Sequence, residues 1–152
     1  MTKFSHDELK QRAFERAALV LRHFYEEQKD EFKDDAKLHT RIFETLIAPA
    51  HIDVLGMSEE LKKQNCKEYR EHVVPCAWIR NRAFAMYHEG ATENDVASMV
   101  RRLLKIALIS SDEANIINKK YKYTMPDGWK DDMKYPITAR LDYGKIKLIP
   151  RD

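Results

Sequence analysis

The sequence predicts an α+β fold that is predominantly α-helical, with N-terminal helices packed on a C-terminal part that holds a short β-hairpin and further helices. Apolar residues recur at helical spacing in most of the chain, and two short stretches rich in β-branched residues interrupt that pattern. Only 4 Gly and 5 Pro occur in 152 residues, which excludes a low-complexity or loop-dominated chain. We expect one compact domain overall, with a helical scaffold over residues 1–64 and a functional part over residues 65–152.

The N-terminal scaffold is predicted to begin with a long helix. Ser5 and Glu8 match a capping box, in which each side chain accepts a hydrogen bond from a backbone amide at the helix start. Behind this box, apolar side chains recur at helical spacing as far as about Gln28, at Leu9, Ala13, Ala17, Val20, Leu21 and Phe24.

The rest of the scaffold is predicted to hold two shorter helices with a loop between them. An amphipathic pattern over residues 38–47 ends at Pro49, because proline cannot continue the hydrogen bonding of a helix. Residues 50–57 are predicted to form a loop, and a short helix then runs from Ser58 to near Asn65.

The C-terminal part is predicted to start with a strand and two helices. Residues 69–74 include β-branched side chains and end at Pro75, which suits a short strand. Residues 76–88 return to helical spacing, and Gly90 is placed to stop that helix. Thr92 then caps a further helix.

A second strand and another helix are predicted to follow. Residues 105–109 form either a strand or a continuation of the preceding helix, and Ser110 or Ser111 caps the next helix. The chain from Tyr121 onward is predicted to be mostly irregular, apart from a terminal strand at residues 146–149.

The charge balance limits the partners that the chain can have. Its 27 Lys and Arg against 25 Asp and Glu give a net charge of +2, which argues against a strongly basic nucleic-acid coat protein and against an acidic DNA mimic. Residues 1–64 carry 11 basic and 13 acidic side chains, whereas the remainder carries 16 basic and 12 acidic ones. An anionic partner would therefore prefer the C-terminal part.

The N-terminal sequence and the cysteines indicate the cellular location and the kinds of site that we expect. The N-terminus has no apolar region of the kind found in secretory signals, and no apolar run has the length of a membrane span. We therefore expect a cytoplasmic protein without a membrane partner. The two cysteines, Cys66 and Cys76, do not support a zinc ribbon or a disulfide scaffold.

The most distinctive segment is Glu71-His72-Val73-Val74-Pro75. A neutral histidine is able to deprotonate water near pH 7, and a carboxylate suits a hard divalent ion such as Mg²⁺. These are the parts that metal-assisted phosphodiester hydrolysis needs, with the ion stabilising the leaving oxygen while the histidine activates the nucleophile.

This segment resembles the first strand of the HNH, or His-Me finger (ββα-metal), nucleases, which commonly reads acid-His-aliphatic-aliphatic-Pro. The resemblance implies an endonuclease built on a β-hairpin followed by a helix, with Mg²⁺ or Mn²⁺ as cofactor and DNA or RNA as substrate. It makes His72 the general base and Glu71 a metal ligand. Residues 105–115 resemble the second strand and the helix, so that Asn115 would be the last ligand, with Glu113 as a competitor for that role.

A non-catalytic interpretation of the same residues stays open. His72 is equally well explained as a half-buried residue that bonds a backbone carbonyl, with Glu71 as a solvated neighbour or a partner of Arg70. The central Asn of the nuclease family has no clear counterpart, and the segment 76–104 is longer than a compact hairpin loop. The alternative function is an interaction or inhibitor protein, for example phage or mobile-element encoded, that binds a protein partner.

Basic side chains supply candidate contacts to nucleic acid. The segment 119–123 alternates lysines with tyrosines, and this arrangement combines phosphate contact with base stacking. Cations near helix C-termini also offset the helix dipole, which is the alternative role for these residues. The residues predicted to contact nucleic acid are Arg80, Arg82, Arg102, Lys119, Lys120 and Lys122.

Overall fold

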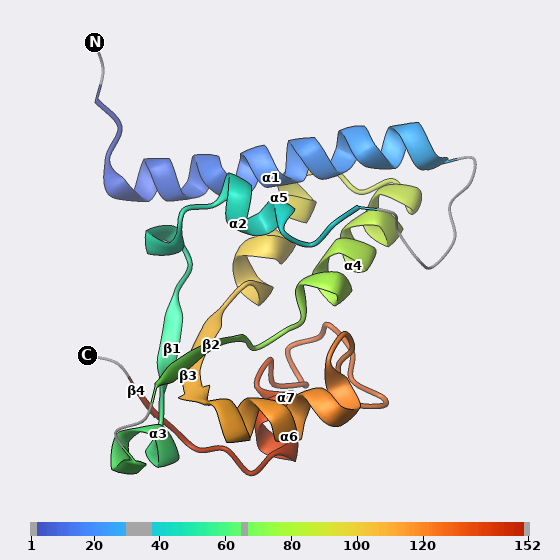
Figure 1. Ribbon diagram of the computed structural model, residues 1–152. Helices are drawn as coiled ribbons and strands as arrows, with labels where there is room; N and C mark the ends of the chain where they lie inside the picture. The colour runs from blue at the N-terminus through green and yellow to red at the C-terminus, as the bar shows by residue number, and fades with distance from the viewer. Residues whose placement is uncertain (1–2, 30–37, 65–66, 151–152) are drawn as a thin grey trace. The chain divides into compact units, whose positions relative to one another are not determined.

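The computed structural model confirms the predicted class, a helix-dominated α+β fold with one small sheet (Figure 1). It describes residues 3–29, 38–64 and 67–150. None of the helices within these ranges has both the length and the apolar character that a membrane span requires. Of the two cysteines, Cys66 lies outside the described residues and Cys76 is half-buried.

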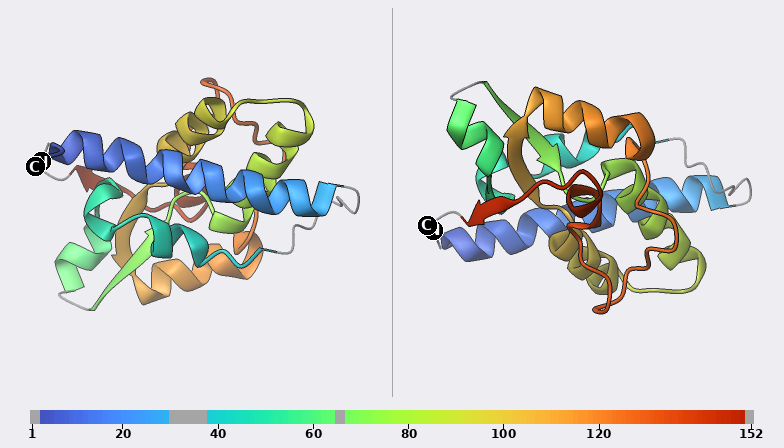
Figure 2. Two further views of the ribbon diagram at one scale, coloured as in Figure 1. Left: turned by 90° about the horizontal axis from the view of Figure 1, so that it is seen from above. Right: turned by 90° about the horizontal axis from the view of Figure 1, so that it is seen from below.

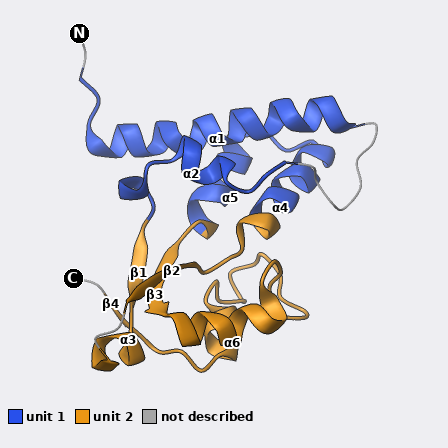
Figure 3. Cartoon of the chain, viewed as in Figure 1, with its two compact units in different colours: residues 1–52, 79–102 blue, residues 53–78, 103–152 orange. Residues whose placement is uncertain are grey.

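The chain divides into two compact units, and each of them is built from two separate stretches of sequence (Figure 3). Unit 1 consists of residues 1–52 and 79–102, and unit 2 consists of residues 53–78 and 103–152. This division differs from the single boundary after residue 64 that the sequence suggested.

Unit 1 begins with α1 (His6–Gln28), the long helix that the sequence predicted. The capping box is present, because the Glu8 amide donates to Ser5 Oγ at 3.1 Å and the Ser5 amide donates to Glu8 Oε2 at 3.3 Å. The buried residues of α1 recur at helical spacing and form one face of it: Ala13, Phe14, Ala17, Ala18 and Leu21.

Three further helices belong wholly or mainly to unit 1. They are α2 (Ile42–Leu46), α4 (Cys76–His88), whose first turn lies in unit 2, and α5 (Glu93–Leu103). Helices α4 and α5 confirm the predicted pair, and Gly90, with φ 92°, takes up the left-handed backbone of the turn between them. The Tyr87 hydroxyl donates to the carbonyl of Ala18 at 2.6 Å and so fixes α4 against α1.

Unit 2 is built around a four-stranded sheet in the order β2-β3-β1-β4. Its strands are β1 (Val54–Ser58), β2 (Glu68–His72), β3 (Ile106–Ser110) and β4 (Leu148–Pro150). Strand β3 runs parallel to β1 and antiparallel to β2, and all five of its residues are buried. The segment at 105–109 is therefore a strand, which settles the alternative that the sequence left open.

Strand β1 corrects the prediction of a loop over residues 50–57. Its sequence contains Gly56, which weakens the strand pattern, but the sheet requires a glycine at that position. A Cβ at Gly56 would lie 2.4 Å from the backbone oxygen of Ile149 on β4. The close approach of the two strands therefore accounts for the glycine, and β4 itself confirms the predicted terminal strand.

Helices α3 (Glu59–Gln64), α6 (Ser111–Tyr121) and α7 (Ala139–Tyr143) complete unit 2. The N-cap of α6 is Ser110, one of the two serines that the sequence offered. Between α6 and α7 the chain follows an irregular path over residues 122–138 (Figure 2). Helix α7 is an addition to the prediction, which treated the chain beyond residue 121 as mostly irregular.

Candidate functional site

The predicted motif, residues 71–75, begins at the end of β2. The second predicted segment, residues 105–115, contains β3, which pairs with β2. Glu71 lies opposite Ala107 of β3, and His72 lies opposite Ile106, in an antiparallel register. Helix α6 follows directly after β3, so the three elements run strand, strand, helix. Helices α4 and α5 occupy the long connection between the two strands, as the sequence predicted.

Glu71 is committed to an ion pair in the interior of unit 2. The residue is 6% exposed, and its Oε1 lies 3.0 Å from Nη2 of Arg140, which is 1% exposed. Arginine keeps its charge at neutral pH, so a buried guanidinium faces the oxygen that the resemblance assigns to a metal ion. That positive charge opposes the binding of a divalent cation at the same carboxylate.

Arg140 itself is held by four acceptors. Nε donates to the Tyr121 carbonyl at 2.8 Å, and Nη1 donates to the His72 carbonyl at 2.7 Å. Nη2 donates both to Glu71 and to Asn118 Oδ1, each at 3.0 Å. Burial lowers the pKa of the guanidinium, and the charge of Glu71 opposes that shift. The arginine thus ties β2, α6 and α7 together.

His72 and Glu71 do not converge on one point. Neighbouring residues of a strand project to opposite faces of the sheet, and Glu71 uses its face to reach Arg140. The His72 side chain is half-buried, with Nδ1 inside the protein. Its backbone carbonyl is the acceptor that Arg140 uses.

The two other predicted metal ligands lie on α6 in different settings. Glu113 Oε1 accepts hydrogen bonds from the Ser58 hydroxyl at 2.6 Å and from the Ser110 amide at 3.0 Å, which completes the capping box of the helix. Asn115 is exposed. Across the described ranges, no group of three or more His, Cys, Asp or Glu side chains is arranged to hold a metal ion.

The predicted cations of α4 and α5 lie in unit 1, and two of them have partners there. Arg80 donates to the Leu38 carbonyl at 2.6 Å and to Asn81 Oδ1 at 3.1 Å. Arg82 lies 4.0 Å from the carboxylate of Glu89. Arg102 is exposed at the end of α5.

The predicted cations of unit 2 lie at the end of α6 among tyrosine rings. Lys120 Nζ is 5.4 Å from the ring centroid of Tyr121 and 5.6 Å from that of Tyr143, and the two rings meet edge to face at 4.9 Å. Lys122 Nζ is 5.3 Å from the ring centroid of Tyr123. The hydrogen bond with Tyr121 raises the pKa of the Lys120 ammonium, a group that is charged at neutral pH even at its ordinary pKa.

The exposed side chains at the end of α6 and on α7 offer two kinds of contact group, lysine ammonium groups and tyrosine rings. Tyr123 is 62% exposed and Tyr143 is 46% exposed, and the three lysines are exposed as well. We refer to this set as the lysine–tyrosine surface: Lys119, Lys120, Lys122, Tyr123 and Tyr143. Tyr143 belongs to α7, and neither it nor Arg140 was singled out from the sequence, because both lie in a stretch without periodic pattern or motif.

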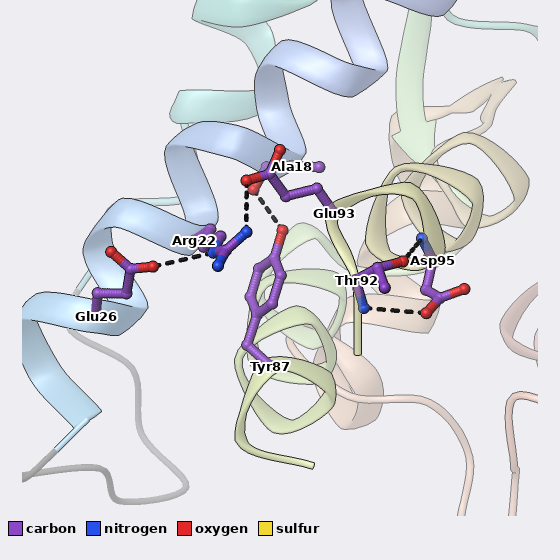
Figure 4. Close-up of polar contacts among 7 residues, drawn as sticks. All are labelled: Ala18, Arg22, Glu26, Tyr87, Thr92, Glu93 and Asp95. Atoms are coloured by element: carbon purple, nitrogen blue, oxygen red, sulfur yellow. Dashed lines mark hydrogen bonds and ion pairs between the residues drawn. The ribbon is translucent and has the colours of Figure 1, made fainter. Parts of the chain in front are cut away.

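Unit 1 contains a second polar cluster, which the sequence did not indicate. Figure 4 shows Arg22 of α1 between two carboxylates, at 2.9 Å from Glu26 and 2.8 Å from Glu93 at the start of α5. The hydrogen bonds that Arg22 donates to Glu93 and Glu26 raise the pKa of its guanidinium. The pair with Glu93 links α1 to α5 across 71 residues of sequence.

A hollow of about 720 Å³ opens beside this cluster. Its charged lining residues are two cations, Arg22 and Lys29, and two carboxylates, Glu26 and Glu93, so their charges balance. Tyr87 forms part of the lining, and burial raises the pKa of its hydroxyl. The hydrogen bonds of Arg22 and Tyr87 join α1 to α5 and to α4 within unit 1. Because the charges of the lining balance, the hollow favours neither an anionic nor a cationic ligand.

Comparisons with known proteins found no matching family model, no similar curated protein and no similar solved structure.

Proposed function

We propose that the chain binds nucleic acid through the lysine–tyrosine surface of unit 2. In this proposal Glu71 is a structural residue, which forms the buried ion pair with Arg140. The observation that carries the proposal is the position of Lys120 against the rings of Tyr121 and Tyr143, with further lysines beside it. Lysine ammonium groups neutralise phosphates, while exposed tyrosine rings offer faces on which bases stack.

The chemistry favours single-stranded nucleic acid over a duplex. In a single strand the base faces are accessible to Tyr123 and Tyr143, which are both well exposed. Stacking accepts every base, so we expect little sequence preference. If three lysines each neutralise one phosphate, the logarithm of the binding constant falls with the logarithm of salt concentration with a slope of about −2.

Fluorescence anisotropy with a labelled single-stranded oligonucleotide, as DNA and as RNA, tests this function. The triple variant Lys119→Ala, Lys120→Ala, Lys122→Ala is expected to lose at least about tenfold in affinity and most of the salt dependence. A matched control, Lys62→Ala, Lys63→Ala, Lys147→Ala, removes the same charge from exposed lysines elsewhere in unit 2.

The outcome separates a specific surface from general charge. Equal losses in the two triple variants, or no binding by the unaltered protein at low salt, would contradict the proposal. Tyr143→Leu provides a further check, because it removes a stacking face and leaves the charge unchanged. We expect it to weaken binding without altering the salt slope.

A second candidate function is the metal-dependent nuclease that the motif implied. It is favoured by one observation, the run of β2, β3 and α6, which has the strand, strand, helix order of the HNH core. Incubation with plasmid DNA and Mg²⁺ or Mn²⁺ tests it. On this hypothesis His72→Ala abolishes nicking, whereas His23→Ala, which alters an exposed histidine of α1, leaves it unchanged. Purified protein that does not cleave DNA or RNA with either ion would exclude this candidate.

A further inference from the structure

Strand β2 forms one edge of the sheet in unit 2. In the part of the chain that the structure describes, it has a strand neighbour on one side only, which is β3. Its first three residues, Glu68, Tyr69 and Arg70, are all exposed. An exposed edge offers a row of backbone donors and acceptors to another strand.

The hydrogen bonding of β2 fixes which backbone groups point outward. The Val73 amide donates to the Lys105 carbonyl at 3.0 Å and continues the ladder between β2 and β3. Residues of an antiparallel pair alternate between bonded and non-bonded positions, so Tyr69, four residues earlier, also faces β3. Glu68 and Arg70, on either side of it, therefore turn their amides and carbonyls away from the sheet.

We propose that β2 pairs antiparallel with β2 of a second copy of this chain, about a two-fold axis that passes between the two Tyr69 residues. The pairing joins two four-stranded sheets into one. Glu68 of each copy then lies opposite Arg70 of the other, and each of these pairs joins outward-facing backbone groups through two hydrogen bonds. Two-fold symmetry is the commonest arrangement of homodimers, and an axis of this kind between two edge strands makes their pairing antiparallel.

The occupant is identified by charge complementarity. The sequence around Tyr69 reads Glu-Tyr-Arg, so reversing the strand places each acid against a base. Opposite charges directly across an antiparallel pair are stabilising and like charges are destabilising. A two-fold axis at Arg70 would set two arginines against each other, and the register centred on Tyr69 avoids that repulsion.

The neighbouring groups confine this pairing to residues 68–70. The His72 carbonyl also faces outward, but it accepts a hydrogen bond from Arg140 and is not open to a second strand. Glu71, on the same face of β2 as Tyr69, is buried and bound to Arg140, so its charge is already compensated within one copy. Tyr69 is 43% exposed, and the two tyrosine rings meet at the centre of the proposed contact. Aromatic cross-strand pairs are among the stabilising pairs of antiparallel sheets.

Charge-reversal variants of the full chain test the proposal by analytical ultracentrifugation over a wide concentration range. The unaltered protein is expected to dimerise. Glu68→Arg and Arg70→Glu each create two like-charge pairs and should raise the dimer Kd by roughly tenfold or more. The double variant Glu68→Arg, Arg70→Glu restores opposite charges and should dimerise like the unaltered protein.

A mixture of the two single variants is the sharpest measurement. One copy then presents two arginines and the other presents two glutamates, so a heterodimer should form at concentrations at which each variant alone is monomeric. Hydrogen exchange locates the dimer contact on the strand. The Arg70 amide should gain protection in the dimer, whereas the Tyr69 amide should be protected in both the monomer and the dimer. The control Glu60→Arg alters an exposed charge on α3 and should leave the dimer intact.

Any one of the following outcomes would overturn the inference. They are a monomer at every concentration, a dimer whose Kd in both single variants equals that of the unaltered protein, and a mixture of the variants that stays monomeric while both are folded by circular dichroism. A monomer that binds a foreign strand at β2 but not a second copy would also overturn it. These results do not depend on nucleic acid, so they are independent of the proposed function.

Discussion

At the scale of single residues, the Arg140 guanidinium determines what Glu71 does. The guanidinium is buried, and its four acceptors come from β2 and α6. Sequence reasoning placed Glu71 and His72 on a strand because the motif is local. It could not supply Arg140, which lies 69 residues away in a stretch without a pattern. Long-range pairs of this kind follow from tertiary packing, which no local spacing encodes.

This arrangement predicts the result of replacing Glu71 by glutamine. The variant keeps the shape of the side chain but leaves Arg140 buried without a counter-charge, so we expect unfolding in urea to show a loss of about 3 kcal/mol. Glu60→Gln, which alters an exposed carboxylate on α3, should change stability by no more than about 0.5 kcal/mol. Equal stability of the Glu71→Gln variant and the unaltered protein would show that the ion pair is not structural.

A second residue-scale prediction concerns pH and the start of α5. The Thr92 amide donates to Asp95 Oδ2 at 3.0 Å, and the Asp95 amide donates to Thr92 Oγ1 at 3.2 Å. The hydrogen bonds from Thr92 lower the pKa of Asp95 below its ordinary 3.8. A lowered folded-state pKa gives stability that is present above the unfolded pKa and is lost as pH falls through the folded pKa.

Replacement of Asp95 by asparagine removes this dependence. The unaltered protein should be more stable than Asp95→Asn near neutral pH, and the difference should shrink as pH falls below about 4. Thermal unfolding of both proteins across the acid range measures it. A difference that stays constant with pH would contradict the role of the charge. Thr92→Ala should reduce the difference, because the Thr92 side chain is one of the two Thr92 groups that lower the pKa of Asp95.

At the scale of elements, the helices other than α7 were predictable, and β1 was not. Capping boxes at Ser5 and Ser110 and the stop at Gly90 are local signals, and the structure contains each of them. Strand β1 has no such signal, since its pattern is broken by Gly56 and its neighbours in the sheet come from distant parts of the sequence. The glycine in β1 is required by the close approach of the β1 and β4 backbones, which the local sequence does not reveal.

Replacement of Gly56 by alanine tests that explanation. The added Cβ would lie 2.4 Å from the Ile149 oxygen, which is a backbone atom, so β1 and β4 must move apart. We expect a loss of about 1–3 kcal/mol in the free energy of unfolding. Hydrogen exchange should become faster at β4 and stay unchanged at β2, which pairs only with β3. Unaltered protection of β4 would mean that the strands accommodate the methyl group.

At the scale of the whole molecule, the sheet explains why the chain does not divide after residue 64. Strand β3 pairs with β1 on one side and with β2 on the other. Residues 53–64 therefore belong to unit 2, which also contains residues 103–152. Composition suggested a boundary because the acidic balance of the first part changes there. Strand pairing is independent of that balance, so the charge asymmetry did not locate the unit.

This organisation predicts the behaviour of a fragment that contains residues 65–152 alone. The fragment lacks β1, so the buried β3 loses a neighbour and β4 loses its partner strand. It also carries α4 and α5 without α1. In the full chain the Tyr87 hydroxyl of α4 donates a hydrogen bond to the Ala18 carbonyl of α1, and the fragment loses that contact. Exposed apolar surface and unpaired backbone groups then remain in both units, and neither can reach the stability of a folded domain.

Circular dichroism and a urea titration should show no cooperative transition for the fragment, whereas the full chain unfolds cooperatively. A cooperative transition of the fragment would mean that the sheet does not need β1.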